Sequence, residues 1–161
     1  MMPQILQNMK EIIAYPLAVI FNRSMQQSDV PAEWRQANIT PIFKKGAKTD
    51  PSNYRPVSLT SVVCKLLEGL IKEQLVDHLE GNNLISKFQH GFRKNKSCVS
   101  NLFDYLDKVS EFLDLGEPVD VVYLDFRKVF DLVCHRHLVR KLEGCGVRGK
   151  TLSWIQAWLT G

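Results

Sequence analysis

Two carboxylates follow a short apolar stretch of the sequence. Residues 121–126 read VVYLDF, Asp125 ends the apolar run, and Asp131 comes six residues later. Apolar residues on both faces predict a buried central strand that ends at a cleft. An ionised carboxylate there is costly unless a cation or hydrogen-bond donors satisfy it. Arg127 or Lys128 could form that salt bridge, and a bound divalent metal ion could do the same. The residues alone therefore leave open a salt-bridged or turn-capping aspartate and a metal ligand.

Two basic stretches contain aromatic residues. Residues 86–100 hold four cations and no acid, and residues 34–57 hold five cations against a single acid, Asp50. Cations interleaved with aromatic rings suit contact with phosphates and stacking on bases or sugars. Charge alone favours the plainer interpretation, which is a pair of solvated loops.

Apolar spacing predicts the elements that must position these residues. Residues 4–27 have helical spacing, and Pro16 should kink or divide that helix. Between Val30 and Thr60, short apolar runs separated by a polar loop predict two strands. The other expected elements are helices over 61–80, 97–115, 135–143 and 150–159, and the strand over 119–126.

Length and composition are typical of one globular domain. The chain has 161 residues, 45% hydrophobic and 24% charged, with a net charge of +4. Neither a run of about 18 apolar residues nor a secretion signal is present, so we expect a cytoplasmic or nuclear protein without a membrane partner. The four widely spaced cysteines are expected to be reduced thiols.

Four ordered motifs then carry a family resemblance. PAEWRQANITPIFKKG, NYRPVSLTSVVCKLLE, QHGFRKNKSC and the stretch from VVYLDFRKVFD to the C-terminus occur in this order. Together they resemble the reverse transcriptase of non-LTR retrotransposons, in particular vertebrate LINE-type elements. The resemblance extends from about residue 14 to the end of the sequence.

The resemblance implies an α+β, predominantly helical, right-hand polymerase fold. Residues 1–29 would be an N-terminal helical segment, and 30–118 the fingers, with a β-hairpin, and the first palm helices. Residues 119–161 would be a partial palm with one strand, without the thumb or the second palm hairpin.

The resemblance also implies a nucleotidyl transfer site. Asp125 would be catalytic and would hold Mg²⁺ together with the main-chain carbonyl of Phe126. Phe130 would lie beneath the incoming sugar and exclude a ribose 2′-hydroxyl. Asp131 would cap the next helix, or less readily serve as a second metal ligand. The remaining expected contacts are Lys44, Lys45 and Arg55 with the dNTP, and Gln89, Gly91 and Arg93 with the template or nucleotide. RNA template, DNA primer and dNTP are the implied partners, and no obligate protein partner is evident.

The sequence departs from the family pattern in two respects. It contains no Asp-Asp pair, which the family carries on a later palm hairpin, so we expect this chain alone to be inactive. The first aspartate motif has also diverged: Arg127 and Val129 stand where the family has small residues, and Cys134 where it commonly has proline. One alternative is therefore a non-catalytic nucleic-acid-binding or interaction remnant of a degenerate element, and another is a translated pseudogene piece without function.

Overall fold

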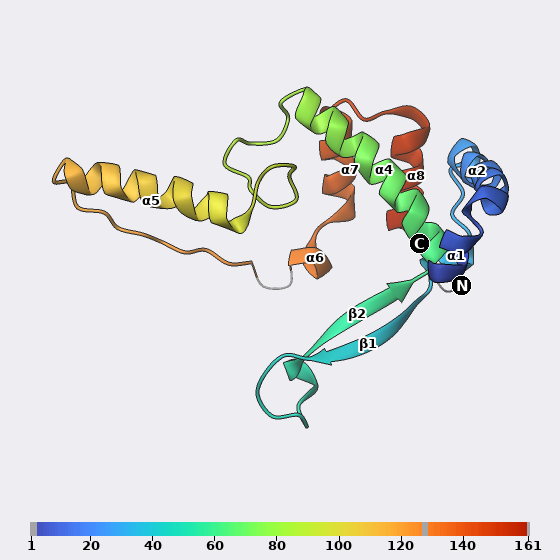
Figure 1. Ribbon diagram of the computed structural model, residues 1–161, viewed down its shortest axis with the longest axis horizontal. Coiled ribbons are helices and arrows are strands. Elements are labelled where there is room, and N and C mark those ends of the chain that lie inside the picture. Colours follow the sequence, from blue (N-terminus) through green and yellow to red (C-terminus); the bar gives the residue numbers. More distant parts are fainter. Residues whose placement is uncertain (1–2, 127–128, 161) are drawn as a thin grey trace. The chain divides into compact units, whose positions relative to one another are not determined.

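The computed structural model describes residues 3–126 and 129–160, which fall into two compact units (Figure 1). The first unit combines the chain up to Gln74 with the chain from Cys134 onward, and the second runs from Leu75 to Val133. In chain order the helices are α1 (Pro3–Asn8), α2 (Lys10–Gln27), α3 (Ala32–Arg35), α4 (Val62–Gly81), α5 (Cys98–Asp114), α6 (Val129–Leu132), α7 (His135–Gly144) and α8 (Gly149–Leu159). The strands are β1 (Ala37–Phe43) and β2 (Tyr54–Thr60). The expected helices at 61–80, 97–115, 135–143 and 150–159 and the two strands between Val30 and Thr60 are confirmed.

The N-terminal helix divides at Met9 rather than at Pro16. Met9 leaves the helical conformation at φ −103° and ψ 11°, whereas α2 continues through Pro16. A proline inside a helix removes one backbone hydrogen bond and crowds the preceding turn. The second half of α2 offsets that cost, because Phe21 and Ser24 are buried there against other helices of the first unit.

The core of the first unit is built around two tryptophans. Trp154 on α8 is 2% exposed, and its indole nitrogen donates a hydrogen bond of 2.9 Å to the hydroxyl of Ser24 on α2. Phe21 and Trp34 meet edge to face, with ring centroids 6.0 Å apart. The buried members of this cluster are Phe21, Val30, Trp34, Cys64, Leu67 and Trp154.

Cys64 is a buried thiol at the start of α4. Its Sγ lies 3.0 Å from Oε1 of Glu68, and burial followed by the bond to Glu68 raises the pKa of the Cys64 thiol to about 12. The thiol is therefore neutral at physiological pH. Cys64 fills the core as a small apolar side chain, in agreement with the reduced state expected from the sequence.

Strands β1 and β2 form an antiparallel hairpin that begins at this core. The register pairs Ala37 with Thr60 at the base and Phe43 with Tyr54 at the loop end. Trp34 lies three residues before β1 and Cys64 four residues after β2, so core residues flank both ends of the hairpin. Figure 1 shows the hairpin extending away from the helices of its own unit.

The expected strand over 119–126 is wrong. Residues 117–126 follow α5 as an unpaired segment, and Figure 1 shows it running back beside that helix. A strand needs a neighbour to satisfy its backbone groups, and the sheet of the described chain consists of β1 and β2 alone. The apolar side chains are accordingly exposed rather than buried, with Leu124 at 86%.

Helix α5 has well-defined ends and an uncovered apolar face. Ser97 caps its N-terminus in a capping box with Ser100, and Gly116 at φ +75° follows its C-terminus. Leu102, Phe103 and Leu106 are each 46–59% exposed, although their spacing is that of a helix face packed on a core. Among the described residues, no helix is long and apolar enough to cross a membrane.

Ser24→Ala tests the bond between α2 and α8. We expect a loss of about 1–3 kcal/mol in the free energy of unfolding, because the buried Trp154 N–H keeps no acceptor. Urea unfolding followed by tryptophan fluorescence measures the change. The control is Ser153→Ala on the exposed side of α8, expected to change stability by no more than about 0.5 kcal/mol. Equal effects of the two substitutions would contradict the assignment.

Candidate nucleic-acid interface

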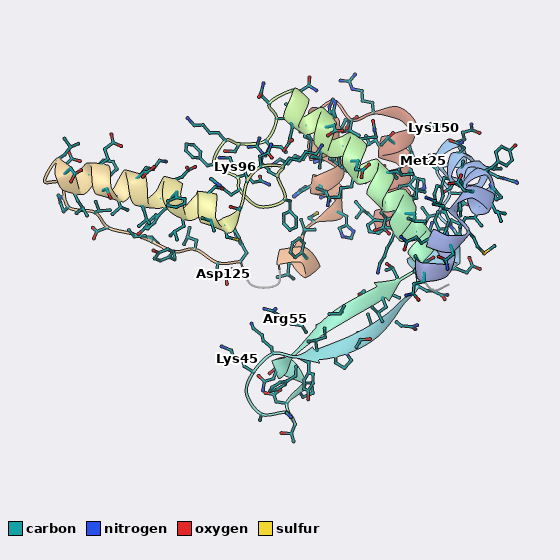
Figure 2. All side chains as sticks on the ribbon, in the orientation of Figure 1. Met25, Lys45, Arg55, Lys96, Asp125 and Lys150 are labelled. Carbon is teal, nitrogen blue, oxygen red and sulfur yellow. The ribbon has the colours of Figure 1, made fainter. Side chains whose placement is uncertain are left out.

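Four cations gather at the loop end of the hairpin. Lys44, Lys45 and Lys48 follow β1, and Arg55 is the second residue of β2. Figure 2 shows Lys45 and Arg55 at this end of the hairpin. In the described part of the chain, none of the four forms an ion pair with a carboxylate. Their charge is therefore available to an anionic ligand.

The register places Lys44 and Arg55 on one face of the hairpin. Arg55 is paired with Ile42, and the Lys44 amide continues the ladder with a hydrogen bond of 2.8 Å to the carbonyl of Asn53. Since side chains alternate along a strand, Lys44 and Ile42 point to the same side as Arg55. Lys44 and Lys45 lie just beyond the end of β1.

The loop that carries the lysines is held by its own hydrogen bonds. The Asn53 side-chain amide donates to the carbonyl of Ala47 at 2.9 Å, and the Tyr54 hydroxyl donates to the carbonyl of Lys48 at 2.8 Å. Gly46 has φ +92°, and a Cβ there would lie 2.6 Å from the Asn53 side-chain nitrogen. Glycine is thus favoured by the backbone conformation, and another residue there would also displace the Asn53 side chain.

Asp50 is the one acid of this loop, and it is engaged in structure. Its carboxylate accepts a hydrogen bond of 2.8 Å from the backbone N–H of Ser52 and caps the 3₁₀ turn Pro51–Asn53. That bond lowers the pKa of Asp50 below its ordinary value. Asp50 is ionised at neutral pH and shapes the loop without neutralising a lysine.

The second basic stretch has a different environment. Arg93 lies 3.4 Å from the Glu80 carboxylate and also donates to the carbonyl of Ser86. Two further ion pairs join Lys94 to Asp77 at 2.9 Å and Lys96 to Asp104 at 3.9 Å. The acids come from α4 and α5, outside the stretch that the sequence analysis counted, so the cations of this loop are largely compensated.

His90 anchors the same loop, and the sequence analysis missed it. Its side chain is buried, with Nε2 3.1 Å from the Asp104 carboxylate and Nδ1 3.0 Å from the hydroxyl of Ser100. The serine pair at 97 and 100 predicts a capped helix start after QHGFR, but nothing in the sequence indicates that His90 is buried beside it.

Gln89 and Gly91 lie in the same loop as His90. The Gln89 side-chain amide reaches the carbonyl of Gly91 at 3.4 Å, at the long limit of a hydrogen bond. Gly91 has open space where a Cβ would be. The expected contacts of Gln89, Gly91 and Arg93 with the template or nucleotide stay predictions.

Asp125 and Phe126 lie at the end of the unpaired segment, and both are exposed. A hydrogen bond of 3.3 Å between the hydroxyls of Tyr123 and Tyr105 ties this segment to α5 and raises the pKa of Tyr105. Phe130 on α6 is 79% exposed. A side chain that excludes a ribose 2′-hydroxyl by its bulk would have to be held rigidly by its neighbours, and the Phe130 side chain is not packed in that way.

Four positions of this motif fall partly or wholly outside the described structure. Arg127 and Lys128 are outside the described residues, as are the side chains of Val129 and Asp131. The backbone of Asp131 lies within α6, and the N-cap position of α7 is Cys134. The side chain of Asp131 is not among those that the structure describes, so its expected capping of the next helix stays a prediction.

Asp125 and Phe126 offer the type of oxygen ligand that Mg²⁺ prefers, but too few of them for two metal ions. A carboxylate and a main-chain carbonyl are the hard oxygen ligands that Mg²⁺ prefers. Yet in residues 3–126 and 129–160, as far as their side chains are described, no three acidic, histidine or cysteine side chains form a metal-binding group. These residues do not by themselves make a site for two metal ions.

Comparison with known families defines the class of protein. The family described as "Reverse transcriptase (RNA-dependent DNA polymerase)" matches residues 42–161, which begin in β1 and include both basic loops and Asp125. The chain belongs to this family.

Individual relatives are polymerases of non-LTR retrotransposons. The chain is 32% identical over 128 residues to the "Probable RNA-directed DNA polymerase from transposon BS" of Drosophila melanogaster, covering 79% of this chain and 14% of that protein. The RNA-directed DNA polymerase of the mobile element jockey from the same fly is 33% identical, covering 79% of this chain and 14% of that protein. The Pol polyprotein of the R2 element of Popillia japonica is 28% identical, with 81% of this chain and 18% of that protein covered. The chain thus spans only a small part of the length of these relatives.

His90→Ala tests the anchoring of the QHGFR loop. Without the imidazole, Asp104 and Ser100 each lose a partner, and the loop should open more readily. We expect hydrogen exchange at the Gln89 backbone amide, which bonds to the carbonyl of Ser86, to accelerate roughly ten- to a hundredfold.

The matched control is Asn101→Ala on the exposed surface of α5, which should leave that exchange rate unchanged. An equally slow Gln89 amide in the His90 variant would contradict the anchoring role.

Proposed function

We propose that this chain contributes the fingers and the first part of the palm to the RNA-directed DNA polymerase of a non-LTR retrotransposon. The observation that carries the proposal is the family match over residues 42–161, which includes the cations of the hairpin loop. In this role the chain binds an RNA template, a DNA primer and a dNTP.

The hairpin supplies the contacts with phosphate. Lys44, Lys45 and Arg55 hold the triphosphate, and the guanidinium of Arg55 can grip two phosphate oxygens at once. Their lack of carboxylate partners within the described chain supports this assignment, because no ion pair has to break first. Arg93 is already paired with the Glu80 carboxylate at 3.4 Å, so it is not an isolated phosphate ligand. In this proposal it orients the loop of Gln89 and Gly91 toward the template.

Asp125 is the catalytic carboxylate of this proposal. It would hold Mg²⁺ with the carbonyl of Phe126, while Phe130 lies beneath the sugar. Two metal ions need more carboxylates than Asp125 provides, so the second aspartate pair has to come from sequence that these 161 residues do not contain. The chain alone is then a binding unit without polymerase activity.

A second candidate is a nucleic-acid-binding remnant of a degenerate element. The observation in its favour is the divergence of the first aspartate motif at Arg127, Val129 and Cys134. We also propose a vertebrate LINE-type parent and a cytoplasmic or nuclear location, both on the sequence motifs alone.

Primer extension tests the division between binding and chemistry. An RNA template with an annealed DNA primer, dNTPs and Mg²⁺ is incubated with the 161-residue chain and with its Asp125→Ala variant. We expect no extension from either and equal affinity of both for the template–primer. Extension by the parent chain that Asp125→Ala abolishes would contradict the need for a second aspartate pair.

Removing charge from the hairpin tests the interface. The double variant Lys44→Gln, Lys45→Gln should bind single-stranded RNA more weakly. The slope of log affinity against log salt should fall by about 0.7 for each phosphate that the protein no longer neutralises.

Lys150→Gln on α8, labelled in Figure 2, is the control and removes one charge elsewhere on the same unit. If it weakens binding as much per charge as the hairpin variant does, the assignment of the interface is wrong.

A further inference from the structure

An apolar pocket lies beside the cations of the hairpin loop. It has a volume of about 450 Å³, within the range of small-ligand sites. The pocket is lined by Pro41, Lys48, Thr49, Pro51, Tyr54 and Pro56. Three prolines and a tyrosine ring therefore make most of its wall.

The register explains why these residues meet on one face. Pro41 is paired with Pro56, and Phe43 with Tyr54. Since alternate residues of a strand share a face, Pro41, Phe43, Tyr54 and Pro56 all point to one side of the hairpin. Lys44 and Arg55 belong to the opposite side, so the pocket is distinct from the proposed triphosphate contacts.

The pocket is formed before any ligand arrives. The hydroxyl of Tyr54 is fixed by its 2.8 Å bond to the carbonyl of Lys48, and its ring meets Phe43 edge to face at 5.5 Å. Prolines have fixed φ angles, and Asp50 caps the turn that contains Pro51. A preformed site loses little conformational entropy on binding.

The chemistry of the site favours a flat ring that is joined to a negatively charged group. The Lys48 ammonium lies 5.9 Å from the centre of the Phe43 ring, at the edge of this surface. Of the six residues that line the pocket, Lys48 is positively charged and none is acidic. A neutral proline-rich peptide would fit the apolar wall but would gain nothing from this charge.

We propose that this pocket receives one unpaired base of a single-stranded nucleic acid. The base packs against the prolines and the Tyr54 ring, and Lys48 contacts an adjoining phosphate. The inference rests on the proposed function, because both take nucleic acid as the ligand. It adds a subsite that binds a base and is separate from the triphosphate contacts.

Two probes of equal charge test the subsite. One is a fluorescein-labelled 12-nucleotide oligouridylate, whose bases stack weakly on one another, and the other is an abasic strand of the same length. Fluorescence anisotropy at one salt concentration should give a roughly five- to hundredfold higher affinity for the probe with bases.

Filling the pocket should remove that preference. Thr49→Met introduces a flexible apolar side chain without an aromatic ring, and it should bring the affinity ratio close to one. The control is Thr40→Met, which adds the same side chain on the other face of the hairpin, where Thr40 pairs with Val57. This variant should keep the higher affinity for the probe with bases. Lys48→Gln should weaken both probes and lower the salt slope by about 0.7. Circular dichroism checks that each variant folds.

The outcomes separate this inference from the proposed function. Equal affinity of the parent chain for both probes, or an unchanged ratio in Thr49→Met, overturns the base subsite while leaving phosphate binding intact. Failure to bind either probe overturns the proposed function as well. Displacement of the oligouridylate by a proline decapeptide at equal concentration would assign the pocket to a peptide instead and overturn the inference.

Discussion

The hydrogen bond from the Trp154 indole to the Ser24 hydroxyl joins parts of the chain 130 residues apart, and the arrangement of the first unit depends on it. It fixes α8 against α2, and the cluster around it includes Trp34 and Cys64. These two residues flank the hairpin, so both strands leave from a packed core. A two-stranded hairpin is marginal by itself. Anchoring at its base, together with the hydrogen bonds of its loop, is what gives the cations at its tip a defined arrangement.

The two basic stretches contain similar residues but differ in what surrounds them. On the hairpin, the described lysines and Arg55 have no carboxylate partner, and the one acid is occupied by a backbone N–H. In the QHGFR loop, acids on α4 and α5 compensate Arg93, Lys94 and Lys96. A count of charges along the sequence cannot distinguish these cases, because Asp77 and Asp104 lie outside the stretch that is counted. The distinction changes the interpretation: the hairpin provides free positive charge, whereas the loop uses its charge to hold its own shape.

Sequence patterns predicted the elements whose stability is local. Helices α4, α5, α7 and α8 were found from apolar spacing and end signals, and the hairpin from its punctuated apolar runs. The prediction of a strand at 119–126 was wrong. A strand forms only beside a neighbouring strand, and the apolar pattern of one segment does not show whether such a neighbour is present. His90 was missed because a histidine in a polar loop gives no indication of burial until Asp104 and Ser100 are brought to it.

Binding and chemistry make different demands on this chain. A phosphate contact tolerates a flexible lysine, because electrostatic attraction extends over several ångströms and needs no exact direction. A metal-binding carboxylate has to be held within about half an ångström of its working position, by neighbours that fix both backbone and side chain. The hairpin satisfies the first demand, with its loop tied by Asn53, Tyr54 and Gly46. Asp125 stands on a segment that pairs with no strand of the described chain, so the second demand is not met there. Under the proposed function, the hairpin would bind nucleic acid without the catalytic step, and that step would require a strand that pairs with residues 119–126.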